Sequence, residues 1–205
     1  MITTYNSQQP GLNLVIMAGV HGDERCGLDA FATLLPTFRP KTGKVTFIIG
    51  NPKALALGTR EFEANLNRMF RPDKDLSTAE QATYEYRRSR ELMSILSEAD
   101  ALLDIHSSTT KQTVPFVICE KQSFDCVAHL PVDVVVTGID ALHPTGTDAF
   151  VNQTGGLGIC IECGNHNDDT TTSVALAAIN SFLQYFDVVN ATTAKTQRTQ
   201  RRIQA

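Results

Sequence analysis

The sequence lacks any apolar run as long as the roughly 18–20 residues that a membrane-spanning helix needs. Its first residues, MITTYNSQQPG, also lack the basic segment and the apolar stretch of a secretory signal peptide. We therefore expect no membrane segment and no export, and the cytoplasm is the default location.

Positive charge is scarce as well, because 18 Lys and Arg residues stand against 22 Asp and Glu residues, a net charge of −4. The tail 191–205 holds Lys195, Arg198, Arg201 and Arg202 and no acidic residue, so the rest of the chain is more acidic than the whole. An acidic body argues against a nucleic-acid partner. For the basic tail we expect a solvated, poorly ordered end rather than an anion-binding segment.

Cysteine is limited to five residues, an odd number in a chain without an export signal, which predicts reduced thiols. The segment CIEC (160–163) has the C-x-x-C spacing of redox and metal sites. It lies in an apolar stretch typical of a buried strand, where successive side chains face opposite sides. Cys160 and Glu162 should then face one side and Cys163 the other, so a site shared by the two thiols is the less favoured interpretation.

The length and composition are typical of one globular domain, with 205 residues, 42% of them hydrophobic and 20% charged. Six apolar segments rich in Val and Ile predict buried strands. They cover residues 12–19, 44–50, 101–107, 114–119, 132–138 and 157–163.

Helical patterns lie between and after these strands. The segment 24–35 is one, and a longer helix is predicted from Ser77, where STAE fits a capping box and an apolar face continues to Ala99. A closing amphipathic helix is predicted around 176–186. Strands mixed with helices, several of the strands apolar on both faces, predict an α/β fold with a largely buried sheet.

Polar residues gather where predicted strands end. His21 and Glu24 follow the first strand in the motif GVHGDE, His106 closes a later strand, and Glu162 lies near the end of the last. Ligand sites of open α/β sheets collect at the carboxyl ends of strands. These four residues are therefore the candidate site.

Two histidines and one carboxylate are a ligand set known from catalytic zinc sites, with one position left open for water. His21 and Glu24 are three residues apart, so one turn places them on the same side, and His106 would be the third ligand. A zinc-bound water has its pKa lowered to about 7 and still needs a base, for which Glu162 is the natural candidate.

Each residue also has a purely structural interpretation. The histidines could be hydrogen-bonded residues in a polar turn, and Glu24 could simply favour a helix N-terminus. Glu162 is harder to explain in this way, because a buried carboxylate without a partner is costly. Together the coincidences favour a site.

The polar segment 51–72, NPKALALGTREFEANLNRMFRP, follows the second predicted strand and supplies Arg60, Asn67 and Arg68. Guanidinium groups bind carboxylates well, so this segment is a candidate clamp for a substrate carboxylate. The alternative for any single arginine is a solvated surface position.

The motifs GVHGDE, NPKAL…TR…NLNRMF, DIHS and IECG, in this order over about residues 12–187, resemble the aspartoacylase/succinylglutamate desuccinylase family. This family is a branch of the zinc carboxypeptidase-like (M14-type) metallohydrolases. The resemblance implies a three-layer α/β sandwich around a mixed, mostly parallel sheet. It also implies one Zn²⁺ per chain, held by His21, Glu24 and His106.

For catalysis the resemblance implies Glu162 as general base and later proton donor. It implies that Arg60 polarises the scissile carbonyl and stabilises the oxyanion, which suits an electrostatic role. Asn67 and Arg68 would hold the α-carboxylate of the substrate. Asp104, two residues before His106 on the same strand, is either a residue that orients a ligand or a structural one.

The sequence departs from the family's pattern in three ways, which limit how much of the family's function can be expected of this chain. Asn65 stands where many members have an aspartate, so one acidic contact is lost. Aspartoacylases carry another arginine about ten residues before the catalytic glutamate, and here Asn152 lies near that place, so N-acetylaspartate is not the expected substrate. Longer relatives continue into a C-terminal β domain. We therefore assign 1–190 to the catalytic domain and 191–205 to a basic tail that could begin that domain.

The short chain is then a natural short form, a truncation, or a homo-oligomer that completes its site between copies. The leading functional hypothesis is a zinc-dependent amidohydrolase that cleaves an N-acyl amino acid or a similar small carboxylate substrate. The alternatives are a metallocarboxypeptidase acting on short peptides and a catalytically degenerate metal-binding α/β module. His129, His143 and His166 receive no role from the sequence.

Overall fold

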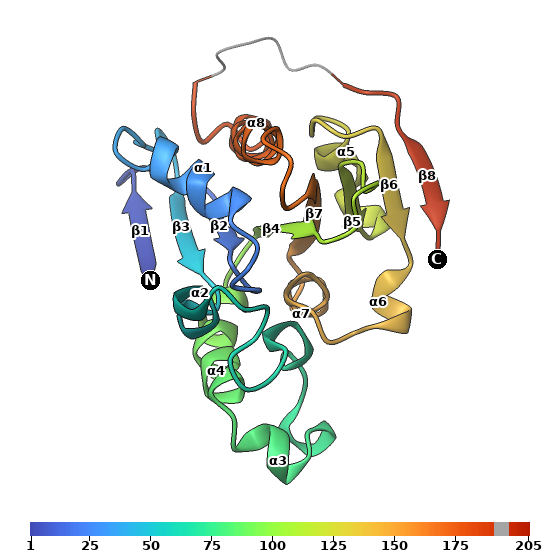
Figure 1. The fold of residues 1–205 in the computed structure, drawn as a ribbon. Coiled ribbons are helices and arrows are strands. Elements are labelled where there is room, and N and C mark those ends of the chain that lie inside the picture. Colours follow the sequence, from blue (N-terminus) through green and yellow to red (C-terminus); the bar gives the residue numbers. More distant parts are fainter. Residues whose placement is uncertain (191–196) are drawn as a thin grey trace.

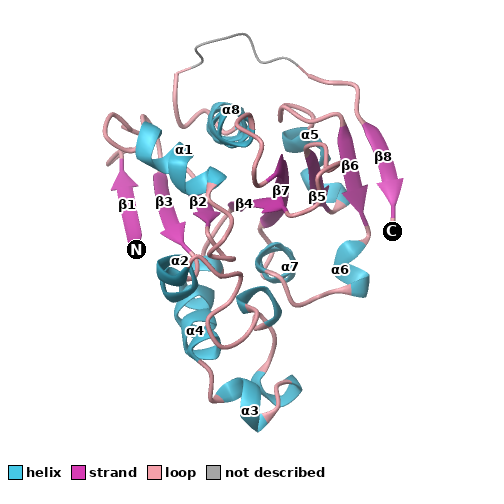
Figure 2. Cartoon of the chain, viewed as in Figure 1, coloured by secondary structure: helices cyan, strands magenta, loops and turns pink. Residues whose placement is uncertain are grey.

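An eight-stranded sheet with helices on both faces organises the chain (Figures 1 and 2). The computed structural model describes residues 1–190 and 197–205. The strand order in the sheet is β1-β3-β2-β4-β7-β5-β6-β8. The strands are β1 Ile2–Asn6, β2 Asn13–Ala18, β3 Lys44–Ile49, β4 Ala101–Ser108, β5 Phe116–Cys119, β6 Val134–Thr137, β7 Leu157–Asn165 and β8 Arg201–Gln204.

All six predicted strands are present, as β2 to β7. β3, β2, β4 and β7 pair in parallel, and so do β5, β6 and β8. The two groups meet at the antiparallel pair of β7 and β5, and β1 is antiparallel to β3 at the far edge. The predicted mixed, mostly parallel sheet is confirmed.

The two edge strands were not predicted as such. β1 and β8 are short and polar, and β8 is exposed along its whole length, so neither carries the apolar pattern of a buried strand. The expectation of a poorly ordered end is wrong for Arg201–Gln204, which pairs in parallel with β6. The part of the predicted tail at 191–196 lies outside the described residues. That this strand begins a further domain stays a prediction.

The helices form the two outer layers of the sandwich. α1, α5 and α8 cover one face of the sheet, and α2, α4 and α7 lie on the other (Figure 2). The α-helices are α1 Cys26–Leu34, α2 Pro52–Leu57, α3 Thr78–Gln81, α4 Tyr84–Leu96, α5 Phe124–Val127, α6 Ile139–Leu142, α7 Thr147–Gln153 and α8 Thr171–Tyr185, with short 3₁₀ turns at Leu66–Arg68, Asp73–Asp75 and Lys121–Ser123.

The predicted helices at 24–35 and 176–186 correspond to α1 and α8. The predicted capping box is present, since Ser77 and Glu80 bond to each other's backbone N–H groups. The long helix predicted from Ser77 is, however, two helices. Thr83 interrupts it and caps α4 instead, accepting a hydrogen bond from the Tyr86 N–H at 3.2 Å. Among the described helices, no segment is both long and apolar enough to cross a membrane.

Two hydrophobic cores follow from the alternation of side chains along the central strands. Leu14 and Ile16 of β2 pack in the core under α1 and α8, whereas Val15 and Met17 pack in the core under α4. The same alternation sends Ile161 and Cys163 of β7 into the α1/α8 core. The polar residues at the strand ends therefore face the side of the sheet that α7 and the segment 51–72 cover.

Buried Glu85 of α4 holds the segment 51–72 in place. Its side chain is fully buried and accepts hydrogen bonds from Asn51 Nδ2 at 2.9 Å and from the backbone N–H groups of Phe62, Glu63 and Ala64 at 2.8–3.2 Å. One carboxylate thus satisfies four donors of a segment that has little regular structure. This contact orders the part of the segment around 62–64, whereas Leu66 and Phe70 anchor its end in the core under α4.

The substitution Glu85→Ala should lower the free energy of unfolding by about 2–4 kcal/mol, because it leaves buried N–H groups without an acceptor. It should also raise amide hydrogen exchange selectively in 58–68. Glu98→Ala, at an exposed glutamate beyond the end of α4, is the matched control and should change stability by less than about 0.5 kcal/mol. Equal protection of 58–68 in both variants would contradict the assignment.

Candidate metal and active site

The turn after β2 carries two of the candidate ligands and is packed against α2. Gly19 has a φ of +66°, a conformation that favours glycine, and starts the turn. A Cβ on Gly22 would lie 2.1 Å from the backbone carbon of Ala54, so only glycine fits there. This close approach fixes His21 and Glu24 on either side of Gly22.

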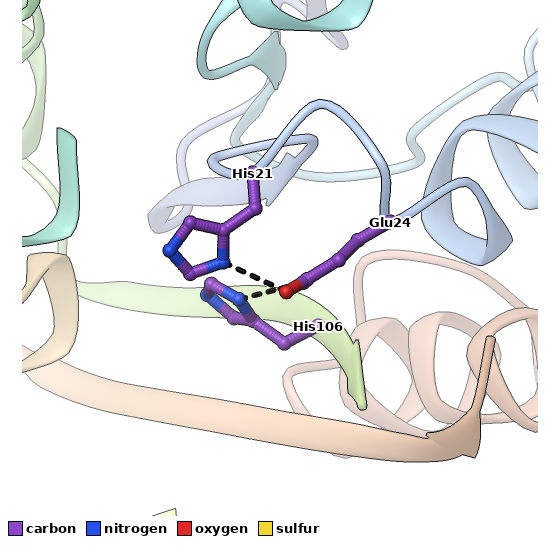
Figure 3. A group of neighbouring side chains, drawn as sticks. All are labelled: His21, Glu24 and His106. Carbon is purple, nitrogen blue, oxygen red and sulfur yellow. Dashed lines mark hydrogen bonds and ion pairs between the residues drawn. The ribbon is translucent and has the colours of Figure 1, made fainter. Parts of the chain in front are cut away.

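His21, Glu24 and His106 meet at one point, as Figure 3 shows. The Nδ1 atom of His21 lies 2.8 Å from Glu24 Oε1, and the Nδ1 atom of His106 lies 2.9 Å from Glu24 Oε2. All three residues are at most 4% exposed. Their ligand atoms lie within 4.8 Å of one another, close enough to share one metal ion.

The far nitrogen of each imidazole faces an oxygen. His21 Nε2 lies 3.3 Å from Asn65 Oδ1, and His106 Nε2 lies 3.0 Å from Asp104 Oδ2. Asn65 is a hydrogen-bond partner of His21 Nε2, whereas Asp104 approaches His106 Nε2 as an ion pair without hydrogen-bond geometry. A proton on Nε2 leaves the Nδ1 lone pair available to a metal ion. Asn65 thus provides an oxygen for His21 although it is not acidic. Asp104, whose role the sequence left open, lies against His106, and Thr147 Oγ1 donates to it in turn.

Two imidazole Nδ1 atoms and a carboxylate that face one another can share protons, as hydrogen bonds, or a single cation. The close contacts shift the pKa values of Glu24 and His106. Burial raises the pKa of Glu24, but the neighbouring His106 and the hydrogen bonds from both histidines lower it overall, well below its usual range. Burial lowers the pKa of His106, whereas Asp104 and Glu24 raise it well above its usual value. The donor set fits a zinc ion, for which two histidines and a carboxylate are typical ligands.

Glu162 lies beside this cluster, because β7 pairs with β4 in the register that sets Glu162 opposite His106. Its Oε2 atom is buried and has no hydrogen-bond partner among the described residues. Burial raises the pKa of Glu162, and the negative charge of Glu24 adds to the rise against the effect of His106. A carboxylate in this position is suited to accept and release a proton.

The residues from the segment 51–72 reach the same place. Arg60 Nη1 lies 3.3 Å from Glu24 Oε1, with about half of the arginine side chain exposed. Asn67 Oδ1 accepts a hydrogen bond from Thr147 N–H at 3.1 Å, and Arg68 Nη1 donates to the Asn67 carbonyl at 2.8 Å. The structure therefore brings Arg60, Asn67 and Arg68 close to the group formed by His21, Glu24 and His106.

One cavity of about 280 Å³ joins these groups, at the lower end of the size range for small-molecule sites. Glu24 lies beneath it and does not line it. Of the predicted site residues, those that line the cavity are His21, His106, Glu162, Arg60, Asn67 and Arg68. Cys160 was predicted to face the same side as Glu162. The other lining residues were not predicted, and they are Ile118, Ile139, His143, Gly146 and Asp148.

These missed residues come mainly from α6, the loop after it and α7, a region whose apolar pattern is too short to predict helices. Cys160 faces the cavity and Cys163 lies in the opposite core, which confirms the predicted alternation. All five cysteines are free. His143 lines the cavity, whereas His166 does not and places its Nδ1 2.8 Å from Ser107 Oγ. His129 packs on the Tyr185 ring away from the site.

Comparisons with known proteins identify the family of the chain. The family model of the succinylglutamate desuccinylase/aspartoacylase catalytic domain matches residues 10–186. A probable aspartoacylase of Prochlorococcus marinus is 32% identical over 123 residues, 56% of this chain and 40% of that protein. A succinylglutamate desuccinylase of Pseudomonas putida is 35% identical over 91 residues, 42% of this chain and 26% of that protein.

The fold is also shared with a solved structure, a succinylglutamate desuccinylase/aspartoacylase from Rhodobacter sphaeroides. It superimposes with a TM-score of 0.79 at 21% identity, over 99% of this chain and 64% of that chain. The match thus spans less than two thirds of the length of these relatives.

The family model covers most of the chain, including every residue that lines the cavity. The chain therefore belongs to the succinylglutamate desuccinylase/aspartoacylase family, whose members are hydrolases acting on N-acyl amino acids.

Proposed function

We propose that the chain is a zinc-dependent deacylase that hydrolyses the amide bond of an N-acyl amino acid. The observation that carries the proposal is the convergence of two imidazole Nδ1 atoms on the two oxygens of Glu24, with an oxygen behind each ring. Ligands oriented in this way from behind are typical of a built metal site.

In this proposal His21, Glu24 and His106 hold the zinc ion. When bound, zinc acts as a Lewis acid that lowers the pKa of a water molecule and polarises a carbonyl group. Glu162 takes the proton from the attacking water and passes it to the nitrogen of the leaving amino acid. The products are the free carboxylic acid and the free amine, so one water is consumed for each amide bond broken.

Arg60 and the pair Asn67 and Arg68 have separate roles in the proposal. The Arg60 guanidinium is 3.3 Å from Glu24, so it can face a carbonyl oxygen near the metal site and stabilise the negative charge that develops there. Arg68 and the Asn67 amide line the same cavity and would bind the substrate α-carboxylate. A small carboxylate substrate fits the cavity of about 280 Å³.

Metal content is the first test. We expect the purified chain to hold about one zinc ion and the variant His21→Ala/His106→Ala to hold none, since two of three ligands are removed. Elemental analysis after dialysis measures this directly. His129→Ala, at a histidine distant from the site, is the control and should retain zinc. A chain that binds no zinc even after reconstitution would refute the metal site.

The orienting oxygen behind His21 gives a finer test of the same site. Asn65→Ala should weaken zinc binding about 10–100-fold, because His21 loses the partner that orients its ring. Competition with a zinc-sensitive dye measures the affinity. Asn65→Asp should bind zinc at least as tightly as the original chain. Unchanged affinity in the alanine variant would show that Asn65 does not orient the ligand.

Glu162→Gln tests the proposed proton carrier. The variant should retain zinc and lose at least about 10²-fold in kcat, because the amide cannot accept a proton. The assay follows release of free amine from a panel of N-acetyl amino acids, with dipeptides beside them to distinguish a carboxypeptidase. Full activity in the variant would remove Glu162 from the mechanism. Zinc binding without turnover on the whole panel would favour a degenerate metal-binding module.

A further inference from the structure

Asp148 is a cavity-lining carboxylate that the proposed chemistry leaves without a role. It lies in the first turn of α7 and lines the same cavity as Glu162 and Arg68. A Cβ added to Gly146 would lie 2.6 Å from Asp148 Oδ1 and 3.4 Å from Asn67 Oδ1, which places the carboxylate close to the amide of Asn67. Because Gly146 has no Cβ, the carboxylate of Asp148 can occupy this space.

No ion pair joins Asp148 to a basic side chain within residues 1–190 and 197–205. Two acidic side chains, Asp140 and Asp104, act on its charge, and His106 acts in the opposite direction. Burial raises the pKa of Asp148 to about 6, and the charges of Asp140 and Asp104 contribute to the rise. The carboxylate is therefore in a position where added positive charge would be favourable.

Asn152 of α7 is engaged in hydrogen bonds within the protein. Asn152 Nδ2 donates to Asp140 Oδ2 at 2.8 Å, and Asn152 Oδ1 accepts from the Gly158 N–H at 2.8 Å and from Gln122 Nε2 at 3.1 Å. Asn152 does not line the cavity. An acidic substrate side chain would meet no basic group from this position.

The remaining walls suit an aliphatic stem. Ile118 of β5, Ile139 of α6 and Cys160 of β7 line the cavity. Methylene groups can pack against these side chains while a charged end group reaches Asp148. Apolar walls that end at a carboxylate suit a cationic group, whereas Arg68 and Asn67 suit a carboxylate.

We propose that Asp148 selects N-acyl amino acids whose side chain ends in a positive charge, such as an amine. The inference rests on the proposed function and names the substrate class for the same site. The α-carboxylate lies at Arg68 and Asn67, and the cationic side chain binds the carboxylate of Asp148. Acidic N-acyl amino acids are disfavoured because they would bring a second negative charge to it.

The test compares Nα-acetyl-L-ornithine with Nα-acetyl-L-norleucine, which has the same length without the charge, and with Nα-acetyl-L-glutamate. We expect kcat/KM for the ornithine substrate to exceed that for the norleucine substrate at least about tenfold, as for a charge pair shielded from water. Asp148→Asn should reduce this ratio to near one, because the ornithine substrate loses the partner of its charged end. Asp140→Asn removes a neighbouring charge outside the cavity and should keep the preference.

Binding of the free amino acids by calorimetry separates this inference from the proposed function. Tighter binding of ornithine than of norleucine, lost in Asp148→Asn and kept in Asp140→Asn, supports the cation site even if no substrate of the panel is hydrolysed. That last result would refute the deacylase proposal instead. Hydrolysis of all three substrates at similar rates would overturn the role of Asp148 and leave the deacylase intact. A preference that survives in Asp148→Asn would do the same.

Discussion

The site depends on a single buried carboxylate, Glu24, whose two oxygens each face an imidazole nitrogen. A buried charge is costly unless it is paired, and the pairing here requires His21 from the same turn and His106 from a strand far along the chain. The parallel pairing of β2 with β4 brings the two together. The oxygens of Asn65 and Asp104 then fix the rings from behind. A fold that failed to align β2 and β4 would leave this charge uncompensated.

A second buried carboxylate stabilises the segment that carries Arg60 and Asn67. Glu85 accepts hydrogen bonds from four donors of this segment and lies on α4, in the layer opposite α1 and α8. The buried side chains of Leu66 and Phe70 anchor the end of the segment, and the polar contacts to Glu85 set the path of its middle part. Arg60 can thereby approach Glu24 while its side chain stays about half exposed, accessible to a small substrate.

The sequence allowed the central strands and the cluster of candidate metal ligands to be predicted because both follow from short-range patterns. β2, β4 and β7 are apolar on both faces, and His21, Glu24, His106 and Glu162 are the polar exceptions at their ends. The edge strands β1 and β8 could not be predicted, because a polar edge strand resembles a loop in composition. The split of the helix from Ser77 depended on one cap at Thr83, which competes with a continuous pattern only weakly.

The cavity wall opposite the metal ligands was not predictable for a different reason. Asp148 reaches the cavity only because α7 packs on β7, where a Cβ on Gly158 would lie 2.0 Å from the Asp148 carbonyl oxygen. No short sequence motif predicts that these two residues are in contact. Strand ends fix the reacting groups, whereas loops and short helices supply the wall that meets the substrate side chain. The chemistry of such a site can thus be inferred from motifs, but its selectivity requires the packed structure, because side chains such as that of Asp148 reach the cavity only through the packing of elements on one another.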